Sequence, residues 1–291
     1  MIKAVKRYLR YFKYAYYFIG MSRVNMAFAR AAATSPLRKI DETDPLSWEF
    51  SGFSQSGGDG IIDFLTRKLL RPNRYSIEIG SNDGIENNTA WLAFARRYTA
   101  MMIDGDKRLA ERCRYLLSPL CLVDVVCMFV NKNNMGEIKK KALYANPDVF
   151  SIDIDGIDYY VAKAFLEAGF KPKIIVVEYN SAFGPSKSIT IEHRENIYEE
   201  RERNEHPGVY WGCSVSGWKT LFSKHGYKFL TVDSNGVDAF FIDPREFDPK
   251  FVKKLKKGLS FRENFSTFWY YRTSWEKLFE SMKDKPLVEV K

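Results

Sequence analysis

The sequence predicts an α/β protein built on a doubly wound, Rossmann-like sheet of seven strands, mostly parallel and ended by an antiparallel hairpin. Three observations support this prediction. Short apolar runs alternate with helix-like patterns, which is typical of a parallel sheet. The first run breaks into a glycine-containing turn, and the next run ends in a carboxylate. The last two runs are joined by an Asn-Gly pair, a strong signal for a hairpin.

The elements follow one another in a regular order. The predicted strands are 75–80, 98–104, 120–127, 149–154, 173–179, 227–232 and 238–243. Between the first five strands, apolar residues at helical spacing predict helices over 87–96, 106–117, 134–144 and 158–169. A further helix over 61–70 precedes the first strand, and Asn235-Gly236 separates the last two.

Composition divides the chain into three parts. Residues 1–48 form a basic, aromatic arm and linker, 49–245 the α/β domain, and 246–291 an aromatic helical extension that we expect to pack on the body or beside the N-terminal arm. The formal net charge is +9. The basic residues of the first 40 positions, which hold no acid, are Lys3, Lys6, Arg7, Arg10, Lys13, Arg23, Arg30, Arg38 and Lys39. The rest of the chain is therefore formally neutral, which disfavours a nucleic-acid enzyme because such enzymes spread basic residues over the binding face.

The N-terminal arm predicts peripheral contact with a membrane. Residues 1–21 mix basic and aromatic side chains, as surface-lying amphipathic helices do. The uncharged stretch over 14–22 is far shorter than the ~20 residues of a spanning helix. A helix docked on the body and a cleaved targeting segment ending near Ala31 are the alternatives. Four cysteines without a C-x-x-C pair predict reduced thiols, and hence a cytoplasmic protein with contact at the inner face of the membrane.

The first strand and turn predict a nucleoside site. Glu78 lies in the strand, the turn Gly80-Ser81-Asn82-Asp83-Gly84 follows, and the next strand ends at Asp104. In open α/β sheets this layout places a carboxylate where it can accept hydrogen bonds from ribose hydroxyls. The additional acid, Asp83, would repel a diphosphate but suits a cationic ligand. The dinucleotide pattern G-x-G-x-x-G is absent.

A second polar group follows the fourth and fifth strands. Asp153 and Asp155 end one strand, and Glu178 and Asn180 end the next. Both ends fall at the carboxyl edge of the sheet, where such folds bind ligands. Oxygen ligands of this kind suit Mg²⁺. The same groups could instead bind sugar hydroxyls or supply a general base, or Asp153 and Asp158 could cap backbone amides.

These motifs resemble those of class I S-adenosylmethionine-dependent methyltransferases, and in particular the FkbM-like family. The matching segments are Ser54-Gln55-x-Gly57-x-Asp59-Gly60, Glu78-Ile-Gly-Ser-Asn-Asp-Gly84, Ile103-Asp-Gly-Asp106, Ser151-Ile-Asp-Ile-Asp-Gly156, Val177-Glu-Tyr-Asn180, Gly212-Cys-Ser214 through Gly226-Tyr227, and Gly236-Val-Asp-Ala-Phe-Phe-Ile242. The resemblance covers about residues 50 to 243. It implies a Rossmann-like fold, S-adenosylmethionine as donor, and O-methylation of a sugar, glycan or small metabolite.

The resemblance also implies roles for single residues. Those implied to bind the cofactor are Glu78, Gly80, Ser81, Asp83, Asp104, Asp124 and Asp153. Among them, Asp104 would face the ribose and Asp124 the adenine. Related branches hold Mg²⁺ at positions similar to Asp153, Asp155, Glu178 and Asn180, although the family pattern has an acid where this chain has Asn180.

Methyl transfer to a hydroxyl requires a base or a cation that lowers the hydroxyl pKa. Asp155 and Glu178 are the predicted catalytic residues, with His193 as a further candidate in the charged insert over 186–210, which we expect to cover the acceptor. An NAD(P)-dependent oxidoreductase and a non-catalytic, membrane-associated adaptor of the same fold are the alternative functions. The sequence leaves the acceptor and the oligomeric state open.

Overall fold

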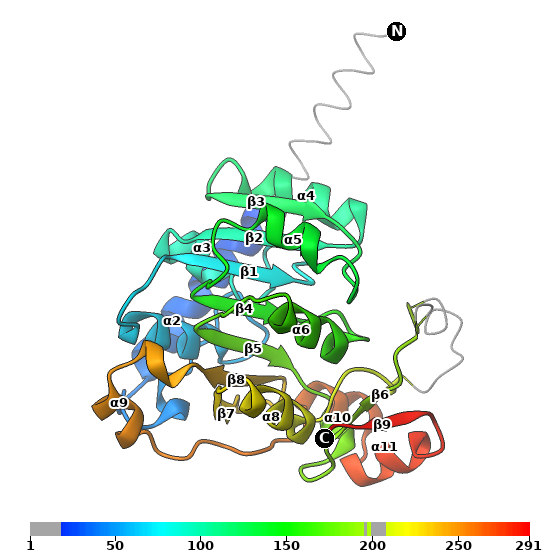
Figure 1. The fold of residues 1–291 in the computed structure, drawn as a ribbon. Coiled ribbons are helices and arrows are strands. Elements are labelled where there is room, and N and C mark those ends of the chain that lie inside the picture. Colours follow the sequence, from blue (N-terminus) through cyan, green and yellow to red (C-terminus); the bar gives the residue numbers. More distant parts are fainter. Residues whose placement is uncertain (1–18, 195–196, 199–207) are drawn as a thin grey trace, which may run out of the picture.

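The computed structural model describes residues 19–194, 197–198 and 208–291, and it confirms the predicted fold class. Seven strands form one sheet in the order β3-β2-β1-β4-β5-β8-β7, in which β8 alone runs antiparallel to its neighbours (Figure 1). The strands are β1 (Tyr75–Ile79), β2 (Thr99–Asp104), β3 (Val123–Cys127), β4 (Val149–Ile152), β5 (Ile174–Glu178), β7 (Lys228–Val232) and β8 (Asp238–Ile242). Each lies within three residues of its predicted limits.

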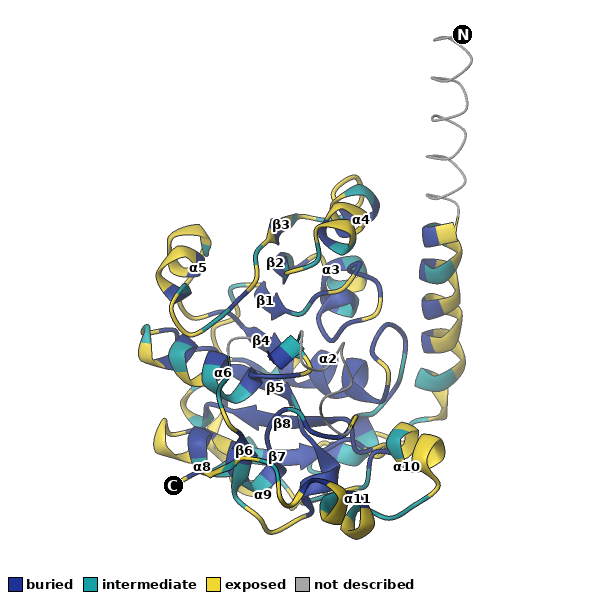
Figure 2. Ribbon diagram, turned by 90° about the vertical axis from the view of Figure 1, so that its right-hand side faces the viewer, coloured by how far each residue is buried: buried dark blue, intermediate teal, exposed yellow. Residues whose placement is uncertain are grey.

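Helices cover both faces of the sheet. α5, α6 and α8 pack on one face, and α2, α3 and α4 on the other (Figure 2). Their bounds are α2 (Gly58–Lys68), α3 (Ala90–Arg96), α4 (Lys107–Leu117), α5 (Met135–Lys141), α6 (Asp158–Glu167) and α8 (Val215–Lys224). The short elements are η1 (Ser35–Leu37), η2 (Pro45–Trp48), η3 (Ser181–Phe183), η4 (Pro244–Glu246) and α9 (Pro249–Lys254). Such two-sided covering explains why the central strands are apolar on both faces.

The register of the central strands brings their carboxyl ends together. Ile79 of β1 pairs with Ile103 of β2 and with Ile152 of β4, and β4 continues in parallel with β5. The residue after each of these strand ends is therefore placed at one edge of the sheet. This edge carries most of the polar residues that the sequence singles out.

The antiparallel hairpin forms where the Asn-Gly pair predicts it. Gly236 has a φ of +74°, in the left-handed region that favours glycine. Asp233 holds the turn, because its carboxylate accepts hydrogen bonds from the amides of Asn235 and Asp238. β8 then pairs with β5, with Asp238 opposite Glu178. The turn therefore brings a further carboxylate to the ligand edge.

The N-terminal arm lies partly outside the described residues. The predicted membrane contact through 1–21 falls almost entirely on residues 1–18, so it stays a prediction. The chain is helical over 19–34 and docks on the body through the buried side chains of Val24, Ala27 and Ala31. No helix in the described part of the chain has the length and apolar character that crossing a membrane requires. The predicted polar linker contains a fully buried Trp48, whose ring stacks on Phe64 at 4.0 Å.

The C-terminal extension consists of α10 (Phe265–Tyr271), α11 (Trp275–Met282) and β9 (Leu287–Glu289). α11 buries Leu278 and Met282 against the body, and β9 pairs with β6 (Ile189–Ile191) in a second, two-stranded sheet that the sequence pattern did not predict. The prediction that the aromatic tail packs on the body is therefore correct for α11. For α10, which has no buried residue, it stays a prediction.

A buried ion pair lies at the amino edge of the sheet, opposite the carboxyl edge that carries the polar residues. Lys173 and Asp148 are 3% and 0% exposed, with 2.7 Å between Nζ and Oδ1, and Asp148 also accepts from the amides of Asn73 and Arg74. We expect Lys173→Met to lower the free energy of unfolding by about 3–5 kcal/mol, because it leaves a buried carboxylate without its cation. Urea denaturation checks this. Lys163→Met, which removes one partner of an exposed pair with Glu167, is the control and should cost under ~1 kcal/mol.

Candidate functional site

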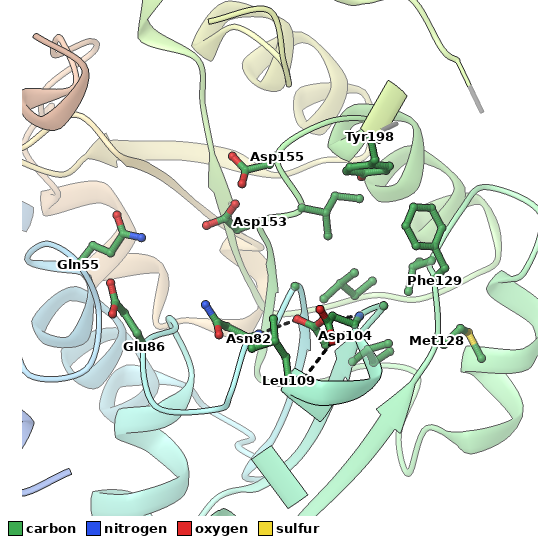
Figure 3. Close-up of a pocket in the computed structure, with 17 residues that line it drawn as sticks. Gln55, Asn82, Glu86, Asp104, Leu109, Met128, Phe129, Asp153, Asp155 and Tyr198 are labelled. Atoms are coloured by element: carbon green, nitrogen blue, oxygen red, sulfur yellow. Dashed lines mark hydrogen bonds between the residues drawn. The ribbon is translucent and has the colours of Figure 1, made fainter. Parts of the chain in front are cut away.

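A cavity of about 560 Å³ opens at the carboxyl edge of the sheet (Figure 3). It is lined by Gln55, Ile79, Gly80, Asn82, Glu86, Ile103, Asp104, Gly105, Asp106, Leu109, Met128, Phe129, Val130, Asp153, Ile154, Asp155 and Tyr198. Five of these residues are acidic, and none of the described lining residues is a lysine or arginine. The volume suits a small-molecule ligand, and the charge favours a cation.

Asp104 ends β2 and faces the cavity. Its Oδ2 accepts a hydrogen bond from the amide of Asn82 at 2.8 Å, and its Oδ1 accepts from the amide of Asp106 at 2.8 Å. Burial raises the pKa of Asp104, although both hydrogen bonds favour the ionised form. Each oxygen keeps a second lone pair, so the carboxylate can still accept from two neighbouring hydroxyls of a ligand.

The turn after β1 is held by close backbone packing. The amides of Gly80 and Ser81 both donate to the carbonyl of Ile103, at 2.9 and 3.1 Å. Gly80 has a φ of +85°, and a Cβ there would lie 1.7 Å from the carbonyl oxygen of Asp153. Glycine at this position therefore lets the ends of β1 and β4 approach each other, which places Asp153 in the cavity wall. No helix begins at this turn, since α3 starts only at Ala90.

A small annex of about 20 Å³ adjoins the cavity and is strongly acidic. Glu78, Asp153 and Asp238 line it together with the amide side chain of Asn88, which donates to Asp238 at 3.2 Å. Burial raises the pKa of Glu78 to about 7. Burial and the nearby Asp233 carboxylate raise the pKa of Asp238 well above its usual value. Carboxyls in this state become ionised when a cation enters.

Three carboxylates gather where β4 and β5 end. Ligand atoms of Asp153, Asp155 and Glu178 all lie within 4.8 Å of one another. Burial, and then the charge of Asp155, raise the pKa of Asp153 to about 7; burial, and then the charge of Asp153, raise that of Glu178 well above its usual value. Asp155 adopts a φ of +56°, an uncommon backbone conformation for a residue with a side chain. Such a group can hold a divalent cation or retain a shared proton.

The fourth predicted metal ligand, Asn180, is not part of this group. Its side-chain nitrogen donates to the carbonyls of Val209 and Trp211 at 2.7 and 2.8 Å, and its oxygen accepts from the amide of Ala182. The amide therefore joins the end of β5 to the insert. Asp158, the alternative backbone cap, accepts from the amides of Ile154 and Gly156 and so shapes the loop that carries Asp155.

Four other predicted site residues lie apart from the cavity, its annex and the group of three carboxylates. Asp83 is buried in an ion pair with Arg23 of the N-terminal helix, and Ser81 is buried beneath the turn. Asp124 is exposed on β3. His193 stacks edge-on against Tyr160 of α6, with 4.9 Å between ring centroids. The structure thus brings together Glu78, Gly80, Asp104, Asp153, Asp155 and Glu178, and leaves these four apart.

The cavity also uses residues that the sequence did not single out as site residues. Phe129 and Tyr198 close one side with their rings in T-shaped contact at 5.0 Å, while Gln55 and Glu86 lie on the opposite side (Figure 3). Tyr198 belongs to the insert over 186–210, of which 195–196 and 199–207 lie outside the described residues, so the predicted cover over the acceptor stays a prediction. Gln55 belongs to the motif Ser54-Gln55-x-Gly57-x-Asp59-Gly60, which contributes to the family resemblance. This motif was therefore the sequence signal that could have identified Gln55 as a site residue.

Asp59 fixes the loop that carries Gln55. Its buried carboxylate accepts hydrogen bonds from the amides of Gly52, Phe53 and Ser54, at 2.6–2.9 Å. Burial raises the pKa of Asp59 to about 6. The motif around Gln55 is therefore one that shapes a loop at the cavity edge.

Comparison with known proteins adds structural similarity only. No family model matches this chain, so the FkbM-like resemblance stays a prediction. No curated protein matches it either. Among similar solved structures is an O-methyltransferase from Bacillus cereus in complex with SAH, 16% identical, with 76% of this chain and 89% of that chain covered and a TM-score of 0.41. The O-methyltransferase TomG from Streptomyces achromogenes, involved in tomaymycin synthesis and in complex with SAM, is 16% identical, with 75% and 95% of the two chains covered and a TM-score of 0.42. Cofactor-bound Rv0187 from MTB is 16% identical, with 76% and 88% covered and a TM-score of 0.41. Similarity at this level says nothing of the activity of this chain.

Proposed function

We propose that this protein is an S-adenosylmethionine-dependent O-methyltransferase that acts on a hydroxyl of a sugar, a glycan or a small molecule. The observation that carries the proposal is the acid-lined cavity at the carboxyl edge of the sheet, without a lysine or arginine among its described lining residues. S-adenosylmethionine is a nucleoside with a sulfonium and an ammonium, so its charge complements this wall. When bound, it supplies an electrophilic methyl group.

Two parts of the cavity suit two parts of such a donor. Asp104 offers carboxylate oxygens to a ribose, beside the apolar side chains of Leu109, Met128 and Phe129. Glu78 and Asp238 in the annex, with Asp153 between annex and cavity, offer negative charge to the cationic end. The turn after β1 presents no helix N-terminus, which dinucleotide enzymes use to bind pyrophosphate. This argues against the oxidoreductase alternative.

The group of Asp153, Asp155 and Glu178 supports the chemistry on the acceptor. A hydroxyl is a weak nucleophile, and a carboxylate with a raised pKa is a better proton acceptor than an ordinary one. The same oxygens would hold Mg²⁺, which lowers the pKa of a bound hydroxyl. Thermal-shift titration with Mg²⁺ separates the two roles: a metal site predicts stabilisation that Asp155→Asn abolishes, whereas a base without metal predicts no shift in either protein.

Calorimetry tests the donor directly. We expect the protein to bind S-adenosylmethionine and S-adenosylhomocysteine and not to bind NADH. Selective binding of NADH would establish the oxidoreductase alternative, and absence of binding to all three would favour the non-catalytic adaptor.

The affinity for the donor should depend on pH. Glu78 and Asp153 have pKa values raised to about 7, so at pH 6 they are mostly neutral and at pH 8 mostly ionised. Since only the ionised carboxyls attract a cation, we expect S-adenosylmethionine affinity to rise by about tenfold from pH 6 to pH 8 for each carboxyl that must ionise. A flat profile in calorimetry would contradict this assignment.

The stability of the protein without ligand should depend on pH in the opposite direction to the affinity for the donor. Because folding raises these pKa values above those of the unfolded chain, the folded state holds its protons more tightly. The free energy of unfolding should therefore fall as the pH rises from about 4.5 towards 7. Bound S-adenosylmethionine should reduce this loss, which denaturation at several pH values would show.

A further inference from the structure

The short helix α10 exposes an aromatic surface that the proposed chemistry does not use. Its exposed fractions are 60% for Phe265, 45% for Phe268, 58% for Trp269, 79% for Tyr270 and 40% for Tyr271. No residue of α10 is buried. Single exposed apolar residues are ordinary, but a contiguous aromatic patch marks an interaction site.

α10 is held firmly at both ends, so its exposure is not the fraying of a chain terminus. At its start, the amide of Asn264 donates to Ser181 Oγ at 3.0 Å and the amide of Phe265 donates to the carbonyl of Asn235 at 2.9 Å. Beyond its end, the amide of Trp275 donates to Glu263 at 2.6 Å. The body therefore presents these aromatic rings outward on a fixed helix.

The attachment also places α10 close to the candidate site. Ser181 follows the end of β5, the strand that carries Glu178, and Asn235 lies in the β7–β8 turn. That turn leads directly to Val237 and Asp238, which line the acidic annex. A surface that α10 binds would therefore lie near the turn that leads to the annex residues.

The charges around α10 indicate what kind of surface this helix binds. Exposed Arg262 and Arg272 lie on either side of α10, and the Arg272 guanidinium stacks on Trp269 at 3.6 Å. The helix over 19–34 lies on the same side of the molecule as α10 (Figure 2) and leaves Met26 71% exposed. Of the nine basic residues among the first 40 positions, this helix holds Arg23 and Arg30. Arg23 pairs with Asp83 and Arg30 donates to the carbonyl of Gly52, so the basic charge beside α10 comes from Arg262 and Arg272. Tyrosine and tryptophan favour the headgroup zone of a bilayer, and basic residues favour anionic lipid.

We propose that α10 and the exposed side of the helix over 19–34 form a docking face for an anionic lipid bilayer, with the rings of Phe265, Phe268, Trp269 and Tyr270 at the headgroup level. This inference goes beyond the proposed methyl transfer and does not depend on it. Docking would hold the cavity beside the bilayer, where lipid-attached acceptors lie.

Vesicle co-sedimentation of the full chain tests the proposal. Vesicles of phosphatidylcholine are compared with vesicles of phosphatidylcholine mixed with phosphatidylglycerol. We expect binding to the anionic vesicles, weaker binding to phosphatidylcholine alone, and a loss of affinity of about tenfold or more in the double variant Trp269→Ser, Tyr270→Ser, since both side chains are exposed and would lose their burial in the interface.

The matched control is Leu143→Ser with Tyr144→Ser, an exposed apolar pair that follows α5, the helix that Figure 2 shows on the other side of the molecule from α10. It should bind vesicles as the unchanged protein does. Donor binding by calorimetry should be the same in all three proteins, so a failure of docking is distinguishable from a failure of the proposed activity. Equal vesicle binding by the α10 variant would overturn the proposal. A protein that does not bind vesicles but self-associates, and that loses this self-association in the α10 variant, would also overturn the proposal. The face would then bind a second copy of the chain.

Discussion

Glu178→Gln is expected to leave S-adenosylmethionine affinity unchanged and to lower kcat by about 10²–10⁴-fold, the usual contribution of a general base. Glu178 ends β5 beside Asp153 and Asp155, and it lines neither the cavity of about 560 Å³ nor its annex. Its pKa is raised well above the usual value, by burial first and by the Asp153 charge second. Glutamine keeps the shape but can neither take a proton nor bring negative charge to a metal.

The measurement is S-adenosylhomocysteine formation with an acceptor selected from a panel of sugars and glycans. Glu167→Gln changes an exposed glutamate of α6 and is the control, expected to leave kcat unchanged. If Glu178→Gln turns over normally, the base lies elsewhere in the site. The pH profile adds a second check: the limb of kcat that rises with pH should disappear with the carboxyl.

Asp104→Asn is expected to weaken S-adenosylmethionine binding by about 10²-fold or more. A hydrogen bond to a charged group contributes about 1.5–3 kcal/mol, and a ribose can donate two of them to one carboxylate. Asparagine offers a single, neutral oxygen. The same oxygens accept from the amides of Asn82 and Asp106, so the substitution also loosens the turn after β1.

Calorimetry of Asp104→Asn is compared with that of Asp124→Asn. The sequence resemblance implied cofactor binding by both aspartates, but Asp124 is exposed on β3 and lies outside the cavity lining. We therefore expect Asp124→Asn to bind the donor as the unchanged protein does. Undiminished binding by Asp104→Asn would remove the ribose assignment. A melting temperature close to that of the unchanged protein would confirm that the substitution acts locally.

The strand ends were predictable because they follow from local sequence. An apolar run that breaks at glycine or aspartate ends a strand wherever the strand lies in the sheet, and parallel strands share a carboxyl edge. Asp104, Asp153 and Asp155 therefore line the cavity as expected. The hairpin followed in the same way from Asn235-Gly236.

The direction of side chains within turns was not predictable. Asn82 takes a φ of +52°, which turns Asp83 away from the cavity and toward Arg23, sixty positions earlier in the chain. The side-chain amide of Asn180 donates to the carbonyls of Val209 and Trp211, at the end of the insert and just beyond it, and no local pattern ties these residues to β5. Contacts between residues this distant in sequence form only when the whole chain is packed.

The sequence by itself determined the α/β sheet, its terminal hairpin and the acidic character of its carboxyl edge, because periodicity and turn chemistry are local properties. Only the tertiary structure decided which acids share the cavity, that Asp238 joins Glu78 in the annex, and that the aromatic residues of α10 face outward. The physical reason is that burial and charge pairing depend on neighbours in space, and these come from strands, turns and helices far apart along the chain.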